Sequence, residues 1–380
     1  MTYGGYPARR SVAERVRTHF LRHLEQASPS TGGVACIAAP PEPAAIEALI
    51  DLAFWTSLRR EEGYVPIVSL ALVAPDETPS PLRFARPLPL EPAALAKVAP
   101  AVERPGIHLG VSQIDGALAV WGATRALPAY CLVLEVAAPG LLVIKQHRGG
   151  EHTKFANIAV LEADQVKIVD EQASSLPDCP SLLSSLLGFD TPASWSDSVN
   201  VLVQLSVSMR AHKRGGLLLV VPAGSDRWRD SIVAPIKYEL DPKFSVLADL
   251  MLQKTGDRDR LWQDALGRAV EGIAGLTAVD GATIVTDKHE LLAFGAKITR
   301  RRGSPLVEQT AVTEPIEGWA PTMVHPSSLG GTRHLSAAQF VHDQRDAVAL
   351  VASQDGRFTV FAWSPCEDMV HAHRVEALLL

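Results

Sequence analysis

The spacing of apolar residues predicts a helix at the start of the chain. Val12, Val16, Phe20 and Leu24 lie four positions apart within residues 10–28. This is the spacing of one face of an amphipathic helix. Such a helix packs on a protein core, an interpretation we prefer to a membrane or partner helix.

The rest of the first half alternates between helical and strand patterns. Residues 43–60 repeat the helical spacing with a proline near the start, and the short β-branched run 65–75 predicts a buried strand. Proline recurs from 79 to 105, which predicts an irregular connection around one short helix at 91–99. Six apolar runs follow: 107–113, 116–122, 130–137, 140–146, 155–161 and 165–170. Their close spacing and the glycines between them predict a mostly antiparallel sheet.

The second half has a different pattern. Residues 197–214 predict a helix with basic residues in its last turn, which two glycines end before the continuous apolar strand 217–222. A charged helical run covers 256–270, and residues 277–298 predict two strands joined by a polar turn. Residues 346–363 predict a closing hairpin.

These patterns predict an α/β chain of two domains. The segment 173–198 is rich in Ser and Pro, as domain boundaries often are, and we place the domains at 1–190 and 195–380. The fold class we expect is a C-terminal mixed β-sheet flanked by helices, preceded by an α+β N-terminal domain with a mostly antiparallel sheet. A length of 380 residues also favours two domains.

Composition and charge narrow the function classes. With 47% hydrophobic and 21% charged residues, the sequence is typical of a globular protein, and its net charge of −6 argues against a general nucleic-acid partner. Small anions stay possible because they need only a local pocket. The four cysteines form no C-x-x-C pair, and no apolar run reaches the length of a membrane span. We therefore expect a cytoplasmic protein without a targeting segment, a zinc site or a disulfide framework.

The stretch LGGTRHLSAAQF, residues 329–340, is the first candidate site. A glycine-rich loop that enters a helix directs backbone N–H groups and the positive helix end at an anion. Arg333 offers a forked contact to phosphate, Thr332 a hydroxyl, and His334 a donor or a metal ligand. The same residues also make an ordinary glycine turn and helix start, so this stretch alone leaves both interpretations open.

Two further motifs lie on either side of this stretch. Asp280-Gly281-Ala282 opens a predicted strand, where the carboxylate can bind Mg²⁺ or Mn²⁺, although Asp-Gly is also a common turn. Ser353-Gln354-Asp355-Gly356 alone indicates only a hairpin turn.

Taken in order, the three motifs resemble those of the diadenylate cyclase family. That family carries Asp-Gly-Ala, then Gly-Thr-Arg-His-x-x-Ala, then a Ser-Glu-Glu turn. This chain has Asp280-Gly281-Ala282, residues 331–337 and Ser353-Gln354-Asp355. The basic helix end and the apolar strand from 211 to 221 are similar to the segment that precedes them in the family. The resemblance covers about residues 197–365.

The resemblance implies a reaction and a set of roles. Each subunit of a homo-oligomer binds one ATP, and two apposed sites let each 3′-hydroxyl attack the other α-phosphate, giving cyclic di-AMP and pyrophosphate. The cofactor would be Mn²⁺ or Mg²⁺. Asp280 would be the metal ligand and a catalytic residue, and Asp355 would be the second catalytic carboxylate. The nucleotide-binding residues would be Gly281, Ala282, Gly331, Thr332, Arg333, His334 and Ser353.

The chain also departs from the family pattern. Leu335 stands where many members have a basic or hydroxyl residue, and Gln354-Asp355 replaces the two glutamates. A catalytically silent nucleotide-binding sensor or scaffold is therefore our second hypothesis.

The first half would be a sensory or regulatory domain with an unknown signal ligand. It holds a second Asp-Gly-Ala at Asp115, which we interpret as a tight turn between strands rather than a duplicated motif. His147, Arg148, His152 and Lys154 form a polar cluster that we interpret as a solvated loop, with an anionic signal site as the alternative.

Overall fold

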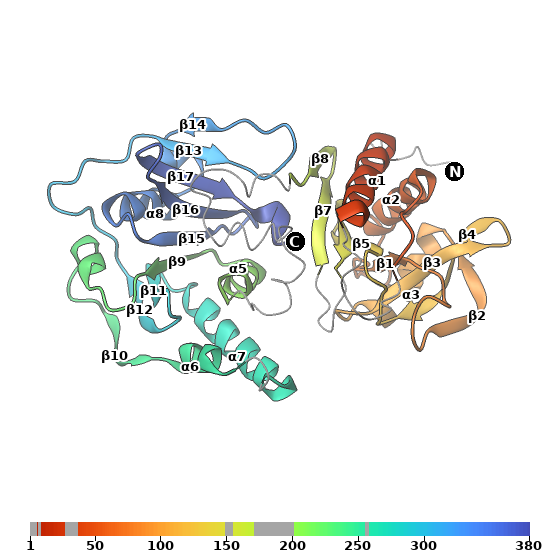
Figure 1. Ribbon diagram of the computed structural model, residues 1–380, viewed down its shortest axis with the longest axis horizontal. Coiled ribbons are helices and arrows are strands. Elements are labelled where there is room, and N and C mark those ends of the chain that lie inside the picture. Colours follow the sequence, from red (N-terminus) through yellow and green to blue (C-terminus); the bar gives the residue numbers. More distant parts are fainter. Residues whose placement is uncertain (1–5, 7–8, 27–36, 149–154, 171–200, 255–257) are drawn as a thin grey trace. The chain divides into compact units, whose positions relative to one another are not determined.

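The structure is a computed structural model, in which the chain forms two compact units (Figure 1). The first unit comprises Met1–Val169 and the second Asp170–Leu379. The structure describes residues 6, 9–26, 37–148, 155–170, 201–254 and 258–380. The predicted domains meet in a segment outside these residues, so the boundary at 190–195 stays a prediction.

The first unit is built on an eight-stranded sheet in the order β2-β4-β3-β1-β5-β6-β7-β8. Every neighbouring pair is antiparallel except β1 and β3. The strands are β1 Ser69–Leu72, β2 Leu82–Pro89, β3 His108–Ile114, β4 Ala117–Thr124, β5 Leu132–Ala138, β6 Leu141–His147, β7 Phe155–Glu162 and β8 Gln165–Ile168. The six apolar runs between 107 and 170 thus form β3 to β8, and the mostly antiparallel sheet is confirmed.

Three helices accompany this sheet. They are α1 Arg9–Gln26, α2 Pro43–Ser57 and α3 Pro92–Val102. Helix α2 packs on β5 and β6, and α1 packs on α2 and on β7 and β8. The apolar face of α1 is buried, with Val16 and Phe20 both 0% exposed, so the predicted packing helix is confirmed.

Strand β2 corrects the expectation of an irregular connection between 79 and 105. It contains Pro87 and Pro89 but stands at the edge of the sheet, next to β4. An edge position tolerates proline because one side of the strand donates no ladder hydrogen bond. These prolines therefore belong to an edge strand and not to an irregular connection.

The upstream Asp-Gly-Ala is a hairpin turn, as predicted. Ile114 pairs with Ala117 across β3 and β4, so Asp115 and Gly116 are the two turn residues. Both have positive φ, 51° and 82°, which is the conformation of a tight two-residue hairpin turn. No nucleotide role is needed to explain this motif.

The polar cluster around His147 differs from the predicted solvated loop. His147 is 3% exposed, and its Nδ1 lies 2.9 Å from the carbonyl oxygen of Pro128. Its ring packs on Phe155, on which His108 also packs. Residue 147 ends β6 and therefore lies inside the sheet layer. His152 and Lys154 lie outside the described residues.

Acidification is expected to destabilise the protein through His108. Burial lowers the pKa of this histidine from 6.5 to about 4. Below pH 6.5 the unfolded chain takes up a proton that the folded chain refuses, so stability falls as pH drops toward 4. At pH 5 the loss from this one group is about 2 kcal/mol.

Urea denaturation at pH 7 and pH 5 checks this. His108→Asn should shrink the stability difference between the two pH values, whereas the same change at the exposed His325 should leave it as in the wild type. An undiminished pH difference in His108→Asn would contradict the assignment.

The second unit is built on a nine-stranded mixed sheet in the order β10-β12-β11-β9-β15-β16-β17-β13-β14. Its two parallel pairs are β9–β11 and β13–β17. The strands are β9 Gly216–Val221, β10 Tyr238–Phe244, β11 Ala282–Thr286, β12 Leu291–Ala296, β13 Thr310–Thr313, β14 Thr322–Val324, β15 Val348–Ala352, β16 Phe358–Ser364 and β17 Met369–Arg374. The predicted C-terminal mixed sheet flanked by helices is confirmed.

Helices flank this sheet. They are α5 Val201–Ala211, α6 Val246–Leu252, α7 Arg260–Leu276 and α8 Thr332–Asp343, with the short 3₁₀ turns η3 Arg227–Ser231, η5 Pro326–Ser328 and η6 Glu376–Leu378. Helix α8 packs on β9, β15, β16 and β17, and buries Phe340 and Val341 in the core at 0% exposure. Helix α5 packs on α7 and on β15 (Figure 1).

Several elements of the second unit had no sequence prediction. The sequence pattern predicts no element where strands β10, β13 and β14 lie. Strand β17 follows the hairpin that we expected to close the chain. Strand β10 is rich in charge and holds Pro242, while β17 carries two buried histidines, His371 and His373. Neither pattern alternates as a half-buried strand normally does.

None of the described helices combines the length and the apolar character that crossing a bilayer requires.

Candidate functional site

Strand register brings the three sequence motifs to one edge of the second sheet. Strands β9 and β11 run parallel, with Leu218 opposite Thr283. Strand β15 runs antiparallel to β9, with Ala352 opposite Gly216. The residues just before β11, the start of β9 and the residues just after β15 therefore meet at the same end. We call this end of the strands the motif edge. It holds the Asp-Gly-Ala motif and the Ser-Gln-Asp turn.

Arg333 joins this edge from the first turn of α8. Its guanidinium lies against Gly215, because a Cβ on that glycine would come within 2.8 Å of the Arg333 Nη1 atom. The same Cβ would lie 3.4 Å from the carbonyl oxygen of Ala352. Gly215 also has a φ of +71°, which disfavours any other residue. The glycine that ends the basic segment thus makes room for the arginine.

The start of α8 offers further anion donors beside Arg333. Gly331 is the N-cap residue and makes no side-chain capping bond, while Thr332 is the first helical residue and is exposed. The first N–H groups of a helix have no partner within it, and they lie at its positive end. Together with the guanidinium, these groups are donors of the kind that phosphate oxygens accept from.

Asp280 presents its carboxylate to solvent at the same edge. The side chain is 89% exposed, and its Oδ2 atom lies 2.5 Å from the Nζ atom of Lys297, just after β12. Hydrogen bonding to Lys297 and its charge hold the pKa of Asp280 below its ordinary value, and Arg333 lowers it further. The Arg333 charge therefore acts on the Asp280 carboxylate across this end of the sheet.

Lys297→Met is expected to raise the pKa of Asp280 toward its ordinary value. The substitution removes the nearby positive charge and its hydrogen bond, which are the main causes of the lowered pKa. The carboxyl ¹³C shift of labelled aspartate, followed from pH 6 to pH 2, measures the change. Lys237→Met is the matched control, because the Nζ atom of Lys237 lies over the Tyr238 ring instead. An equal Asp280 pKa in the wild type and Lys297→Met would contradict the account.

His334 lies inward, unlike the direct phosphate contact that we expected. It is 2% exposed, and its ring packs edge-on to Phe361 at a centroid distance of 6.1 Å. Gly330 admits the ring, since a Cβ there would lie 2.3 Å from the His334 Nδ1 atom. Burial lowers the pKa of His334, so the imidazole is neutral at pH 7. In this conformation the ring packs on Phe361 of β16 and so holds the first turn of α8 against the sheet.

The Ser-Gln-Asp turn has an internal ion pair. The Asp355 Oδ2 atom lies 3.3 Å from the Arg357 Nε atom, and the Ser353 N–H donates to the Arg357 carbonyl oxygen at 2.9 Å. The turn joins β15 and β16, two of the strands on which α8 packs. The carboxylate expected to be catalytic is thus paired within its own turn. Gln354 is exposed.

A pocket of about 320 Å³ opens beside Asp280. Its wall includes Tyr238 of β10, whose ring stacks on Phe294 with a centroid distance of 4.7 Å and an angle of 4°. Lys297 and Lys237 complete the charged part of the wall. The volume lies in the range of small-molecule pockets. Sequence reasoning missed Tyr238 and Lys297, because β10 was not predicted and no motif marks either residue.

Gly281 and Ala282 contribute differently from the pocket lining that we expected. Ala282 is 0% exposed within the core cluster of the second unit, because it begins a central strand. Gly281 has a φ of +115°, and a Cβ on it would lie 2.5 Å from the Gly295 carbonyl carbon. These residues therefore let β11 and β12 approach each other and set the position of Asp280.

The chemistry of Asp280 fits a divalent cation that is bound mainly through substrate. In the described part of the chain, no three His, Cys, Asp or Glu side chains gather into a metal site. Mg²⁺ often binds one or two carboxylates and completes its shell with water and substrate phosphates. The exposed Asp280 carboxylate can serve as the one protein ligand of such an ion.

Fold and site together define a mixed α/β unit with a pocket of about 320 Å³ beside Asp280, preceded by a separate α+β unit. Comparison with family models gives one match, described as "Probable sensor domain DACNV", over residues 35–125. This match lies within the first unit and covers less than half of the chain. No curated protein matches the sequence.

Proposed function

We propose that the chain is a diadenylate cyclase that joins two ATP molecules into cyclic di-AMP and releases pyrophosphate. The observation that carries this proposal is the convergence of the three motifs at one sheet edge, next to a pocket of about 320 Å³. Asp280, Arg333 and the Ser353 turn are far apart in sequence. Their assembly supports a common role in one site.

The described residues divide the work of holding ATP. Arg333, Thr332 and the free N–H groups of α8 hold the triphosphate, with forked charge-assisted contacts from the guanidinium. The pocket beside Asp280 receives the nucleoside, where the Tyr238 ring, held by stacking on Phe294, gives a flat wall. His334 is a positioning residue for the first turn of α8. Phosphoryl transfer of this kind depends mainly on positioning and charge neutralisation.

Asp280 would hold the Mn²⁺ or Mg²⁺ ion. When bound, such an ion neutralises phosphate charge and lowers the pKa of a nearby hydroxyl. The Asp280 carboxylate orients the reacting end of the nucleotide, and Lys297 keeps that carboxylate ionised. In each half-reaction, a bond from a 3′-oxygen to an α-phosphorus forms as the bond to pyrophosphate breaks, and the 3′-hydroxyl proton passes to solvent water.

Two copies of the chain are needed for this reaction. One site binds one ATP, so the second reacting nucleotide comes from an apposed site of a homo-oligomer with two-fold symmetry. Rate per chain should therefore rise with protein concentration until the dimer is fully formed.

The first unit would set the rate in response to a signal. It contains the match to the probable sensor domain over 35–125. The letters DAC in that description are those used for diadenylate cyclase domains, the family that the C-terminal motifs resemble. Sensor and cyclase would thus form one regulated enzyme, in the cytoplasm, where ATP is plentiful.

A coupled assay of pyrophosphate release tests the proposal. Full-length protein with ATP and Mn²⁺ should release one pyrophosphate per ATP consumed, and doubling the protein at low concentration should more than double the rate. A rate strictly proportional to protein concentration in protein that sedimentation shows to be monomeric, or release of orthophosphate instead, would contradict the apposed-site mechanism.

A second candidate is a catalytically silent nucleotide-binding sensor or scaffold. The observation that favours it is the Asp355–Arg357 pair, which engages the one carboxylate of the turn locally. This candidate predicts that ATP or a cyclic dinucleotide binds without any product.

A further inference from the structure

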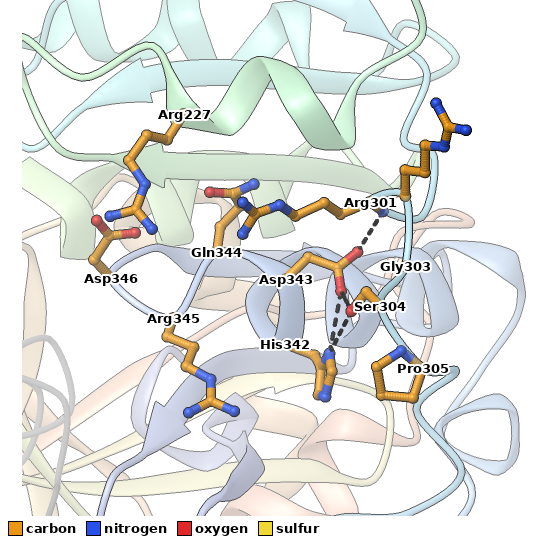
Figure 2. Close-up of a pocket in the computed structure, with 11 residues that line it drawn as sticks. Arg227, Arg301, Gly303, Ser304, Pro305, His342, Asp343, Gln344, Arg345 and Asp346 are labelled. Atoms are coloured by element: carbon orange, nitrogen blue, oxygen red, sulfur yellow. Dashed lines mark hydrogen bonds and ion pairs between the residues drawn. The ribbon is translucent and has the colours of Figure 1, made fainter.

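An arginine-lined cavity lies at the opposite end of α8 from the motif edge (Figure 2). Its volume is about 550 Å³, and its wall includes Arg227, Arg301, Arg302 and Arg345. The motif residues occupy the first turn of α8, whereas this cavity borders the last turn. A helix of 12 residues separates the two ends by roughly 18 Å. The two sites are therefore distinct.

Asp343, the last residue of α8, holds one wall of the cavity in place. Its carboxylate accepts hydrogen bonds from the Arg301 N–H at 2.8 Å, the Gln339 side-chain amide at 3.0 Å and the Ser304 hydroxyl. The Asp343 side chain is 0% exposed. Its charge is thus satisfied inward by these donors, and the loop that carries Arg301 is fixed to the helix.

The arginine side chains are available to a ligand. Arg301 and Arg345 form only exposed ion pairs, at 3.7 Å to Asp230 and 3.3 Å to Asp368. Exposed pairs of this kind contribute little and exchange readily for a better partner. Arg227 forms no ion pair with any described residue. Figure 2 shows the Arg227 side chain extending toward Asp346 and the Arg301 side chain extending toward Gln344.

The Arg345 guanidinium lies 3.8 Å from the Trp363 ring centroid, which fixes its plane. An ordered planar fork loses less freedom when it binds than a mobile side chain does. Asp346 is the one other acidic residue on the wall. Four arginines and two aspartates line the cavity, and Asp343 is bonded inward, so the lining is basic in a chain whose net charge is −6.

We propose that this cavity binds a small ligand with at least two phosphate groups. The guanidinium groups come from η3, from the loop after residue 300 and from the end of α8, so they can contact separate phosphates bidentately. The cavity volume matches a nucleotide or a smaller diphosphate. The inference needs no cyclase activity and is independent of the proposed function.

Isothermal titration calorimetry with inorganic pyrophosphate tests this. The full-length Arg333→Ala variant serves as the parent, so that the motif edge does not contribute to anion binding. Adding Arg227→Ala and Arg301→Ala should weaken binding by about tenfold or more, since charge-assisted contacts are lost. The Arg301 backbone N–H that bonds Asp343 stays in place in this variant.

Arg300→Ala is the matched control, because Arg300 is exposed and adjacent in sequence but does not line the cavity. It should bind pyrophosphate as its parent does. Equal affinity in the Arg227/Arg301 and Arg300 variants would overturn the proposal, as would an Arg333→Ala parent that binds no pyrophosphate at millimolar concentration. Neither result would bear on cyclic di-AMP synthesis at the motif edge.

Discussion

Asp280→Asn is expected to lower cyclic di-AMP formation by about 100-fold or more, the loss typical of a removed electrostatic group at a reacting centre. Asparagine keeps the shape of the side chain but loses the negative charge that a divalent cation requires. The side chain is 89% exposed, so the fold does not depend on it. The melting temperature of Asp280→Asn should match that of the wild type, and its ATP affinity measured without metal should change little.

Asp264→Asn is the matched control for this experiment. Asp264 lies on the exposed face of α7, away from the motif edge, and the same loss of charge there should leave the rate unchanged. Full activity in Asp280→Asn, with Asp264→Asn also active, would refute the role of Asp280. It would also refute the site that the family resemblance implies.

Arg333→Lys is expected to weaken ATP binding by about tenfold or more, as the loss of a charge-assisted forked contact does. Lysine keeps the positive charge but cannot offer two parallel N–H donors. The guanidinium fits against Gly215 and the Ala352 carbonyl, a position that the lysine chain does not fill in the same way. Calorimetry with a non-hydrolysable ATP analogue and Mg²⁺ measures the effect.

Arg268→Lys, at an exposed position of α7, provides the control for a conservative change of the same kind. Its ATP affinity should equal that of the wild type. If Arg333→Lys also binds as the wild type does, triphosphate recognition would not rest on the arginine fork at the start of α8.

Sequence patterns predicted the parts of the fold where apolar residues recur regularly. Strands β3 to β8 and helices α1, α2 and α8 fall where the pattern placed them. Strands β2, β10 and β17 were missed because prolines, charges or buried histidines break the alternation. Their place in a sheet depends on neighbouring strands, which a local pattern does not contain.

The candidate site was predictable only in part for the same reason. The motifs named Asp280 and Arg333, and the structure places them within electrostatic reach of each other. Lys297 and Tyr238 reach the site through strand pairing between β10, β11 and β12, which no motif encodes. His334 lies inward because Gly330 leaves space for its ring, a packing effect that the sequence order does not reveal.

Two buried histidines of the first unit belong to its core. His108 and His147 both pack on Phe155, and burial lowers the pKa of each. Both therefore stay neutral near pH 7. Charge change at these positions would destabilise the unit, so we assign them to the core of the first unit.

Mass spectrometry of the products formed from ATP and Mn²⁺ by the full-length protein tests the central claim most directly. The account predicts cyclic di-AMP in the wild type and its near absence in Asp280→Asn. Bound ATP without any cyclic di-AMP in the wild type, across a wide range of protein concentration, would contradict the claim and favour the silent sensor.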